Sequence, residues 1–176
     1  MLINDQSLES DPYFGNRVQK IASITASMAT ARFNKLLFTK SVDREACFDS
    51  RVFAVPNVVE AMNCLIWRQQ DCTRNSIQSA AYYEIGKVKG KKTTQKIMYK
   101  LNTSQLQELL FKEIGLNWND YSPELKRGTI AIRKLFEIET PNGKAIRSKW
   151  VTEPAPIFQS EDGQKWLLGL FGKEKE

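Results

Sequence analysis

The sequence contains no histidine, and this absence excludes several kinds of enzyme chemistry. Without an imidazole there is no Ser-His-Asp or Cys-His catalytic site, no histidine metal ligand and no histidine proton shuttle. Cysteine is scarce as well, since Cys47, Cys64 and Cys72 are the only three among 176 residues. An odd number without a C-x-x-C pair indicates neither a disulfide framework nor a zinc site, and it fits the reducing cytoplasm.

Long hydrophobic runs are also missing. No stretch of about 18 apolar residues occurs, so we expect no transmembrane helix, and the first residues lack the basic start and apolar core of a signal peptide. The apolar content of 41% is enough for a real core. We expect a short segment at 1–11, a main domain at 12–152 and a tail at 153–176. The formal charge of +6 favours polyanionic partners, although many basic proteins bind nothing anionic.

The most informative stretch lies inside a long predicted helix, from about residue 58 to about residue 86. Apolar residues before and after its centre fall on one broad face at helical spacing. In the centre this face is interrupted, because Gln69, Gln70, Thr73 and Ser76 stand where a core helix carries leucine or isoleucine. Polar groups at such positions must meet water, a cavity or a ligand.

Charged residues accompany this interruption. Arg68, Asp71, Arg74 and Asn75 are three or four positions apart, so neighbouring pairs can touch along the helix. They are either a solvated helix face with ordinary ion pairs or the lining of a ligand site. The residue types alone leave these two interpretations open.

The other predicted elements are placed more coarsely. A helix is expected from Pro12 to about Phe38, with Asp11 as its N-cap and a buried face marked by apolar residues at 21, 24, 28 and 31. Residues 48–55 alternate enough for a strand. Further helices are expected at 93–101 and from an N-cap at Thr103 or Ser104 to about residue 114. The segment 140–143 predicts a hairpin turn between strands at 129–139 and 144–151. The apolar segment 166–171 is expected to dock on the domain or on another subunit.

Four groups of basic or aromatic residues have both a plain and a functional interpretation. Arg17 and Lys20 near a helix start could hold a triphosphate or be surface charge. Lys91 and Lys92 lie in a lysine-rich stretch that is either a solvated loop or a phosphate contact. Trp118 and Tyr121 could stack on a base, although buried anchors are the plainer role. Lys126 and Arg127 form the fourth group, and their functional interpretation is a contact with phosphate.

The helix motif W-R-Q-Q-D-x-x-R-N-S, at 67–76, resembles the signature helix of the tRNA-His guanylyltransferase family and its bacterial and archaeal relatives. Further matches follow in the same order along the chain and extend the resemblance over about residues 12 to 133. They are the segments 12–33, F-D-S-R-V at 48–52, Q-E-L-L-F at 107–111, G-L-N-W-N-D at 115–120 and K-R-G-T at 126–129.

The resemblance implies a polymerase-palm-like α+β fold: part of an antiparallel sheet with helices on one face, and a C-terminal hairpin. It implies nucleotide addition to tRNA 5′ ends in the 3′-to-5′ direction, with GTP or ATP as substrates and two Mg²⁺ ions held by carboxylates. Three groups of residues receive roles. Catalytic roles fall to Asp71, Arg74 and Asn75, triphosphate binding to Arg17, Lys20 and Arg68, and RNA contacts to Lys91, Lys92, Lys126 and Arg127.

The sequence also departs from the family pattern. The family's metal-binding carboxylates lie upstream, on strands that this sequence lacks, and the acidic residues before position 12 are too close to the next helix to replace them. Magnesium is therefore implied while its ligands are absent. Thr73 stands where many members carry a histidine, and it cannot act as a base near neutral pH. Leu106 replaces a lysine of the eukaryotic enzymes, which favours the bacterial-like form.

Three functions follow as hypotheses. The chain is a tRNA-His guanylyltransferase-like enzyme that needs a partner chain or a missing N-terminal part for its metal site, or a non-catalytic RNA- and nucleotide-binding remnant of such an enzyme. The third hypothesis is a structural domain that only oligomerises. tRNA and nucleoside triphosphates are the expected ligands. A partial palm leaves an open sheet edge, so we expect a homo-oligomer or a partner chain.

Overall fold

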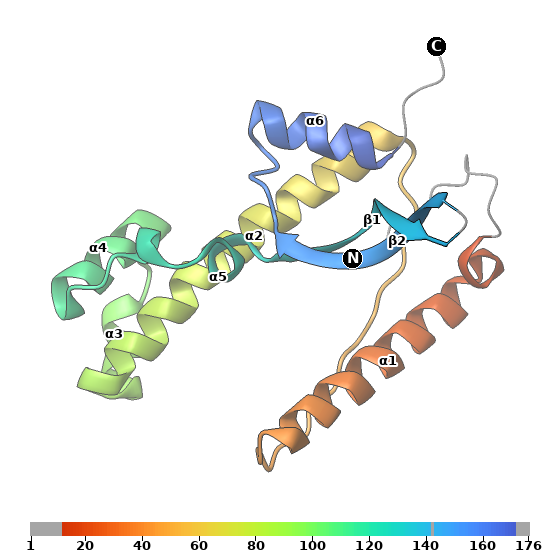
Figure 1. The fold of residues 1–176 in the computed structure, drawn as a ribbon. Helices are drawn as coiled ribbons and strands as arrows, with labels where there is room; N and C mark the ends of the chain where they lie inside the picture. Colours follow the sequence, from red (N-terminus) through yellow and green to blue (C-terminus); the bar gives the residue numbers. More distant parts are fainter. Residues whose placement is uncertain (1–11, 142, 172–176) are drawn as a thin grey trace. The chain divides into compact units, whose positions relative to one another are not determined.

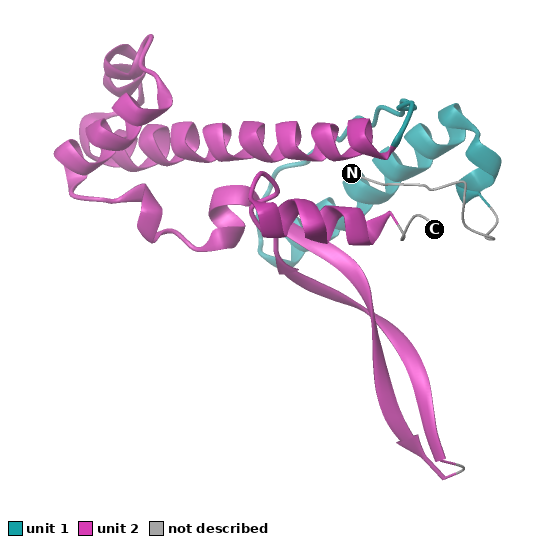
Figure 2. Cartoon of the chain, turned by 90° about the horizontal axis from the view of Figure 1, so that it is seen from above, with its two compact units in different colours: residues 1–57 teal, residues 58–176 magenta. Residues whose placement is uncertain are grey.

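The computed structural model describes residues 12–141 and 143–171, and its helices and strands are drawn in Figure 1. In chain order these are η1 (Tyr13–Asn16), α1 (Val18–Thr39), α2 (Val58–Lys89), α3 (Lys91–Met98), α4 (Thr103–Ile114), η2 (Trp118–Asp120), α5 (Pro123–Arg127), β1 (Thr129–Thr140), β2 (Gly143–Pro154) and α6 (Glu161–Leu170). The chain divides into two compact units, residues 1–57 and 58–176, coloured separately in Figure 2.

The predicted α+β class is confirmed, since helices accompany one antiparallel sheet formed by β1 and β2. The predicted division of the chain into a short segment at 1–11, a main domain at 12–152 and a tail at 153–176 stays a prediction. Within the part of the chain that the structure describes, no helix is long and apolar enough to cross a membrane.

Helix α2 holds the second unit together, because its two halves pack in two separate hydrophobic clusters. Its C-terminal half contributes Ile77, Ala81 and Ile85 to a core that includes Leu106 and Leu110 of α4. Its N-terminal half contributes Met62 to a different cluster, completed by residues 155, 158 and 167. The predicted interruption of the apolar face therefore lies between two hydrophobic clusters.

Local sequence signals explain the ends of α4. The Asn102 side chain accepts a hydrogen bond from Gln105 N–H, and the Gln105 side chain accepts one from Asn102 N–H, which forms a complete capping box. At the other end Gly115 takes a left-handed conformation, with φ of +68°, and closes the helix. The predicted helix ending at about 114 is confirmed, but its N-cap is Asn102 and not Thr103 or Ser104.

The predicted hairpin is also confirmed, with longer strands than expected. β1 and β2 pair antiparallel from Thr129 opposite Pro154 to Thr140 opposite Gly143. Two residues connect the strands, the loop length of the commonest tight hairpins. In Figure 2 the hairpin extends away from the helices of its own unit.

The first unit differs from the prediction. Asp11, the expected N-cap, lies outside the described residues, and Phe14, Gly15 and Asn16 all have positive φ. This irregular turn delays the helix, so α1 begins at Val18 and not at Pro12. The expected buried face at 21, 24, 28 and 31 is wrong, because α1 has no buried residue within the described part of the chain.

The predicted strand at 48–55 is wrong for a physical reason. Side chains of α1 bond the backbone at its start and just before it, and the described sheet contains only β1 and β2. Asn34 bonds both the N–H and the C=O of Ala46, at 2.9 and 3.0 Å, and Phe48 N–H donates to Thr30 Oγ1 at 3.1 Å. Residues 41–55 therefore form no regular element, and the palm-like sheet expected there is not formed by the described residues.

Helix α6 confirms the expectation that the apolar segment near the end docks on the domain. Leu167 is fully buried in the cluster with Met62, and the Phe158 ring stacks on Trp166 with ring centroids 5.9 Å apart. The approach is close enough to require glycine. A Cβ added to Gly163 would lie 1.9 Å from the Ile157 carbonyl oxygen.

We predict that Gly163→Ala destabilises the protein by about 1–3 kcal/mol, because the clash is with backbone and not with a flexible side chain. Urea unfolding followed by circular dichroism measures the change. Gly169→Ala is the matched control on the same helix, where an added Cβ meets no atom within 4 Å, and it should be neutral or slightly stabilising. Equal stability of the two variants would contradict the close approach.

Candidate functional site

The polar centre of α2 is organised around one carboxylate. The Asp71 side chain accepts hydrogen bonds from Arg74 Nη2 and from Asn75 Nδ2, the latter at 3.3 Å. Arg68 Nη1 lies 3.3 Å from the same carboxylate. The Asp71 side chain is only 16% exposed, whereas Arg68 and Arg74 are 56% and 62% exposed. One half-buried anion thus holds two guanidinium groups at the surface.

The arrangement confirms that these four residues meet, as their helical spacing predicted. Its formal charge is positive, since two guanidiniums surround one carboxylate. Arg68 also lies over the Trp67 ring, 5.3 Å from its centroid. Guanidiniums held in place by a carboxylate keep free N–H groups that match the oxygens of a phosphate.

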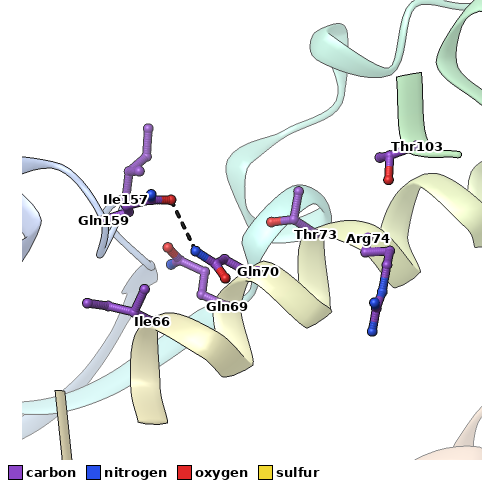
Figure 3. A pocket seen from close by; sticks show the side chains of 8 residues that line it. All are labelled: Ile66, Gln69, Gln70, Thr73, Arg74, Thr103, Ile157 and Gln159. Carbon is purple, nitrogen blue, oxygen red and sulfur yellow. Dashed lines mark hydrogen bonds between the residues drawn. The ribbon is translucent and has the colours of Figure 1, made fainter. Parts of the chain in front are cut away.

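A pocket of about 270 Å³ lies beside this cluster and is shown in Figure 3. Its lining residues are Ile66, Gln69, Gln70, Thr73, Arg74, Thr103, Ile157 and Gln159. The lining is rich in amide and hydroxyl groups, and the Gln70 amide donates to Gln159 Oε1 at 3.2 Å across it. Amide and hydroxyl groups can donate and accept hydrogen bonds but carry no charge. Arg74 supplies the charge among the residues that line the pocket.

Sequence reasoning found the α2 residues of this pocket and missed the others. Thr103, Ile157 and Gln159 come from the start of α4 and from the segment after β2. Nothing in their local sequence signals a site, because only the tertiary packing brings them to α2.

Two of the polar residues in α2 have structural tasks. Gln69 is buried, donates to Pro156 O at 2.7 Å and accepts from Phe158 N–H at 2.8 Å. Ser76 Oγ donates to Leu125 O at 2.6 Å and accepts from Trp118 Nε1 at 3.1 Å. These side chains bind other segments of the chain to α2. Part of the polar centre of α2 therefore has a structural role.

Trp118 and Tyr121 are anchors in this structure. Trp118 is buried and Tyr121 packs against the same cluster. Burial raises the pKa of the Tyr121 phenol above its ordinary value, and the Glu84 carboxylate adds to this effect. The contacts therefore support the predicted role of Trp118 and Tyr121 as anchors of the fold.

The predicted RNA-contact residues fall into two environments. Lys126 Nζ donates to Asn119 O and Arg127 Nε donates to Ala155 O, each at 2.7 Å, so both side chains brace the fold. Lys91 and Lys92 are exposed at the start of α3. Two neighbouring lysines are instead engaged in ion pairs, Lys87 with Glu84 and Lys89 with Glu113.

Arg17 and Lys20 lie in the first unit, at the N-terminus of α1. Arg17 is the N-cap residue, and its Nε lies 3.5 Å from Phe14 O. Lys20 Nζ lies over the Phe14 ring, 5.2 Å from its centroid. Two cations and a helix N-terminus therefore coincide. That they act together with Asp71 stays a prediction.

A metal site was not predicted from this chain's residues, although the family resemblance implies magnesium. Mg²⁺ prefers carboxylate oxygens and water. Among the described residues, no group of three or more acidic or cysteine side chains could hold a metal ion. The one half-buried carboxylate of the candidate site, on Asp71, is surrounded by cationic and amide donors, which do not fit a metal.

Comparison with known proteins places this geometry in a family. The family model for the Thg1 C-terminal domain matches residues 60–164, which include α2 except its first two residues, and the whole Asp71 cluster. The chain belongs to the Thg1 C-terminal domain family. The resemblance inferred from the sequence motifs is thereby confirmed.

Relatives and solved structures agree. The tRNA(His) guanylyltransferase of Debaryomyces hansenii is 28% identical over 130 residues, covering 69% of this chain and 49% of the relative. A bacterial tRNA(His) guanylyltransferase (Thg1)-like protein in complex with ATP has a TM-score of 0.70 and 31% identity, covering 97% of this chain and 65% of that one. A similar protein in complex with GTP has a TM-score of 0.63, 29% identity and coverages of 97% and 62%. This Thg1-family chain spans about half of the length of the curated relative.

We predict that Gln69→Ala lowers the free energy of unfolding by about 2–4 kcal/mol, because it leaves a buried N–H and a buried C=O without partners. Chemical denaturation measures this loss. Gln70→Ala is the adjacent control, since Gln70 is exposed and makes one side-chain bond of 3.2 Å, and it should cost less than about 0.5 kcal/mol. A Gln69 variant as stable as the Gln70 variant would show that the two hydrogen bonds of the Gln69 side chain do not stabilise the fold.

Proposed function

We propose that this Thg1-family chain takes part in adding a nucleotide to the 5′ end of a tRNA in the 3′-to-5′ direction, as a tRNA(His) guanylyltransferase-like protein that uses ATP or GTP. The observation that carries the proposal is the Asp71 cluster, which lies within the matched family region. Two similar bacterial proteins are known in complexes with ATP and GTP, which supports these nucleotides as ligands.

In the proposed reaction the cluster binds and orients phosphate. Arg68 and Arg74 supply free guanidinium N–H groups toward phosphate oxygens, where charge must be neutralised during phosphoryl transfer. Asp71 fixes both guanidiniums, and Asn75 completes the carboxylate's hydrogen bonds. Thr73, next to them in the pocket lining, offers a hydroxyl but no base.

Arg17 and Lys20 are proposed as a second set of triphosphate contacts. Three features converge there: a guanidinium, an ammonium and the N-terminus of a 22-residue helix. Each favours an anion, and a triphosphate is the anion that the proposed reaction requires.

Magnesium belongs to the proposed reaction but does not fit the described residues. Its carboxylates would come from a partner chain or from sequence outside the described ranges. When bound, the ion neutralises and aligns phosphate oxygens. We further propose a cytoplasmic location and a homo-oligomeric state.

RNA contacts are proposed for Lys91 and Lys92, together with Lys126 and Arg127. Lysines meeting phosphates release counterions and make binding depend on salt. Lys91 and Lys92 are the stronger pair of candidates, since the side chains of Lys126 and Arg127 are already hydrogen-bonded to backbone carbonyls.

Changing both Lys91 and Lys92 to alanine should lower the slope of log K against log salt for tRNA binding by about 1–2. Filter binding at several salt concentrations measures the slope. Lys165→Ala is the control, because Lys165 is paired with Glu161 on α6 at 2.7 Å, and it should leave the slope unchanged. A slope that does not respond to the double change would remove this segment from the interface.

The direct test of function incubates the purified protein with Mg²⁺, labelled GTP and tRNA. We expect no label transfer by this chain alone, and transfer when a polypeptide carrying the family's metal-binding carboxylates is added. Arg74→Ala should reduce this transfer and the affinity for GTP at least tenfold. Arg147→Ala is the matched control, because Arg147 is also an exposed arginine and lies on the hairpin.

The non-catalytic alternative is less favoured, because the similar curated relatives bear the names of enzymes. Binding of GTP and tRNA without transfer in the complemented assay would favour it. Absence of binding to either ligand would contradict both functions. Robust transfer by the chain alone would show that the metal ligands are already in this chain.

A further inference from the structure

The segment that contains α3 and the turn after it carries charge of one sign. Between Glu84 and Glu108 the sequence has six lysines and no acidic residue. Two of these lysines have acidic partners, since Lys87 pairs with Glu84 and Lys89 with Glu113. The other four are Lys91, Lys92, Lys96 and Lys100. Within the part of the chain that the structure describes, none of these four forms an ion pair, so their positive charge attracts anions.

Three residues share the outer face of α3, which packs beside the C-terminal part of α2 (Figure 1). Thr94 is fully buried and marks the inner face. Lys92, Lys96 and the C-cap residue Tyr99 follow one another at intervals of four and three positions, so they line the side opposite Thr94. All three are exposed. The stem of Lys91 instead lies close to α2. The outer face of α3 thus combines two ammonium groups with one aromatic ring.

The Tyr99 ring is held in solvent with a cation beside it. It is 70% exposed, and Lys100 Nζ lies 5.2 Å from its centroid. Lys100 has a φ of +60°, in the left-handed region that residues with a side chain rarely adopt. Among the described residues of the second unit, no other residue except glycine has a positive φ. An unfavourable backbone conformation therefore accompanies the placement of a third ammonium group at the ring, and such conformations concentrate at functional sites.

We infer that Tyr99 stacks on the base of an unpaired nucleotide of RNA, while Lys92, Lys96 and Lys100 contact the neighbouring phosphates. Proteins that bind single-stranded nucleic acid combine positive charge along the backbone with aromatic rings on which bases stack. The inference rests on the proposed function for its RNA partner. It adds the form of RNA that this surface selects, because only an unpaired base can leave its own stack and cover the ring.

A solvated basic face is the plainer interpretation of the same residues, and the two interpretations differ in a measurable way. Phosphate contacts alone do not depend on the bases, so a surface of lysines binds single-stranded and double-stranded RNA through the same ionic interaction. Stacking on Tyr99 adds a contribution that only the single strand receives. This contribution does not depend on salt, since no charge takes part in it.

Binding of a labelled RNA of about 12 nucleotides, single-stranded or annealed to its complement, tests the role of Tyr99 by fluorescence anisotropy. Tyr99→Ala should weaken binding of the single strand at least fivefold, change binding of the duplex less than twofold and leave the salt slope unchanged. Tyr99→Phe keeps the ring and should bind like the wild type. Tyr83→Ala, which removes a 59% exposed tyrosine of α2, is the control and should change neither affinity.

Three outcomes of this measurement would overturn the inference. They are a wild-type chain that does not bind the single strand, a Tyr99→Ala variant that binds it as tightly as the wild type, and an equal loss of affinity for the single strand and the duplex. The last outcome would indicate a local change in structure or a purely ionic surface.

Lys100→Gly separates binding from stability. It removes the ammonium group and suits the left-handed backbone, so the midpoint of urea unfolding should stay the same or rise while the affinity for the single strand falls at least threefold. A purely structural Lys100 would move stability and affinity in the same direction, and that result would overturn its role in binding.

These binding measurements need neither Mg²⁺ nor nucleotide transfer, so they distinguish this inference from the proposed function. Single-strand binding that depends on Tyr99, in a protein that transfers no nucleotide even when complemented, would overturn the proposed function and support the inference. Transfer by the complemented protein, with unchanged single-strand binding by Tyr99→Ala, would overturn the inference alone.

Discussion

The carboxylate of Asp71 is the interaction on which the polar centre of α2 depends. It holds the guanidiniums of Arg68 and Arg74 and the amide of Asn75, each three or four positions away along the helix. Without it, the guanidiniums of Arg68 and Arg74, three positions before and three positions after it, would have no carboxylate to hold them in place. The cluster is stable in the free protein and still presents positive N–H groups at the surface, which is the requirement for a preorganised phosphate site.

This arrangement is possible because α2 does not depend on its centre for packing. The apolar contacts are made by its two ends, through Ile77, Ala81 and Ile85 on one side and Met62 on the other. Between them Gln69 and Ser76 replace apolar burial with directional bonds to segments far along the chain. The two hydrophobic clusters therefore hold α2 on either side of the site, and the hydrogen bonds of Gln69 and Ser76 hold its centre.

Local signals predicted much of this fold. The glycine that ends α4 and the two-residue hairpin connection act within a few positions, so the sequence was sufficient to place them, whereas the N-cap of α4 is Asn102 and not the expected Thr103 or Ser104. The predicted strand at 48–55 is wrong because a strand needs a neighbouring strand, whereas here Asn34 and Thr30 of α1 bond the backbone of Ala46 and Phe48. The Asp71 contacts were predictable from helical spacing, whereas Gln159 and Thr103 enter the pocket only through tertiary packing.

The two hydrophobic clusters on α2 share no buried residue, and this has a consequence for how the family can vary. Distant sites without common partners contribute to stability almost independently. One end of the helix can therefore exchange its apolar side chains without compensating changes at the other. The polar centre has less freedom at Gln69, Asp71 and Ser76, since each of these side chains bonds to at least two others or to two backbone groups.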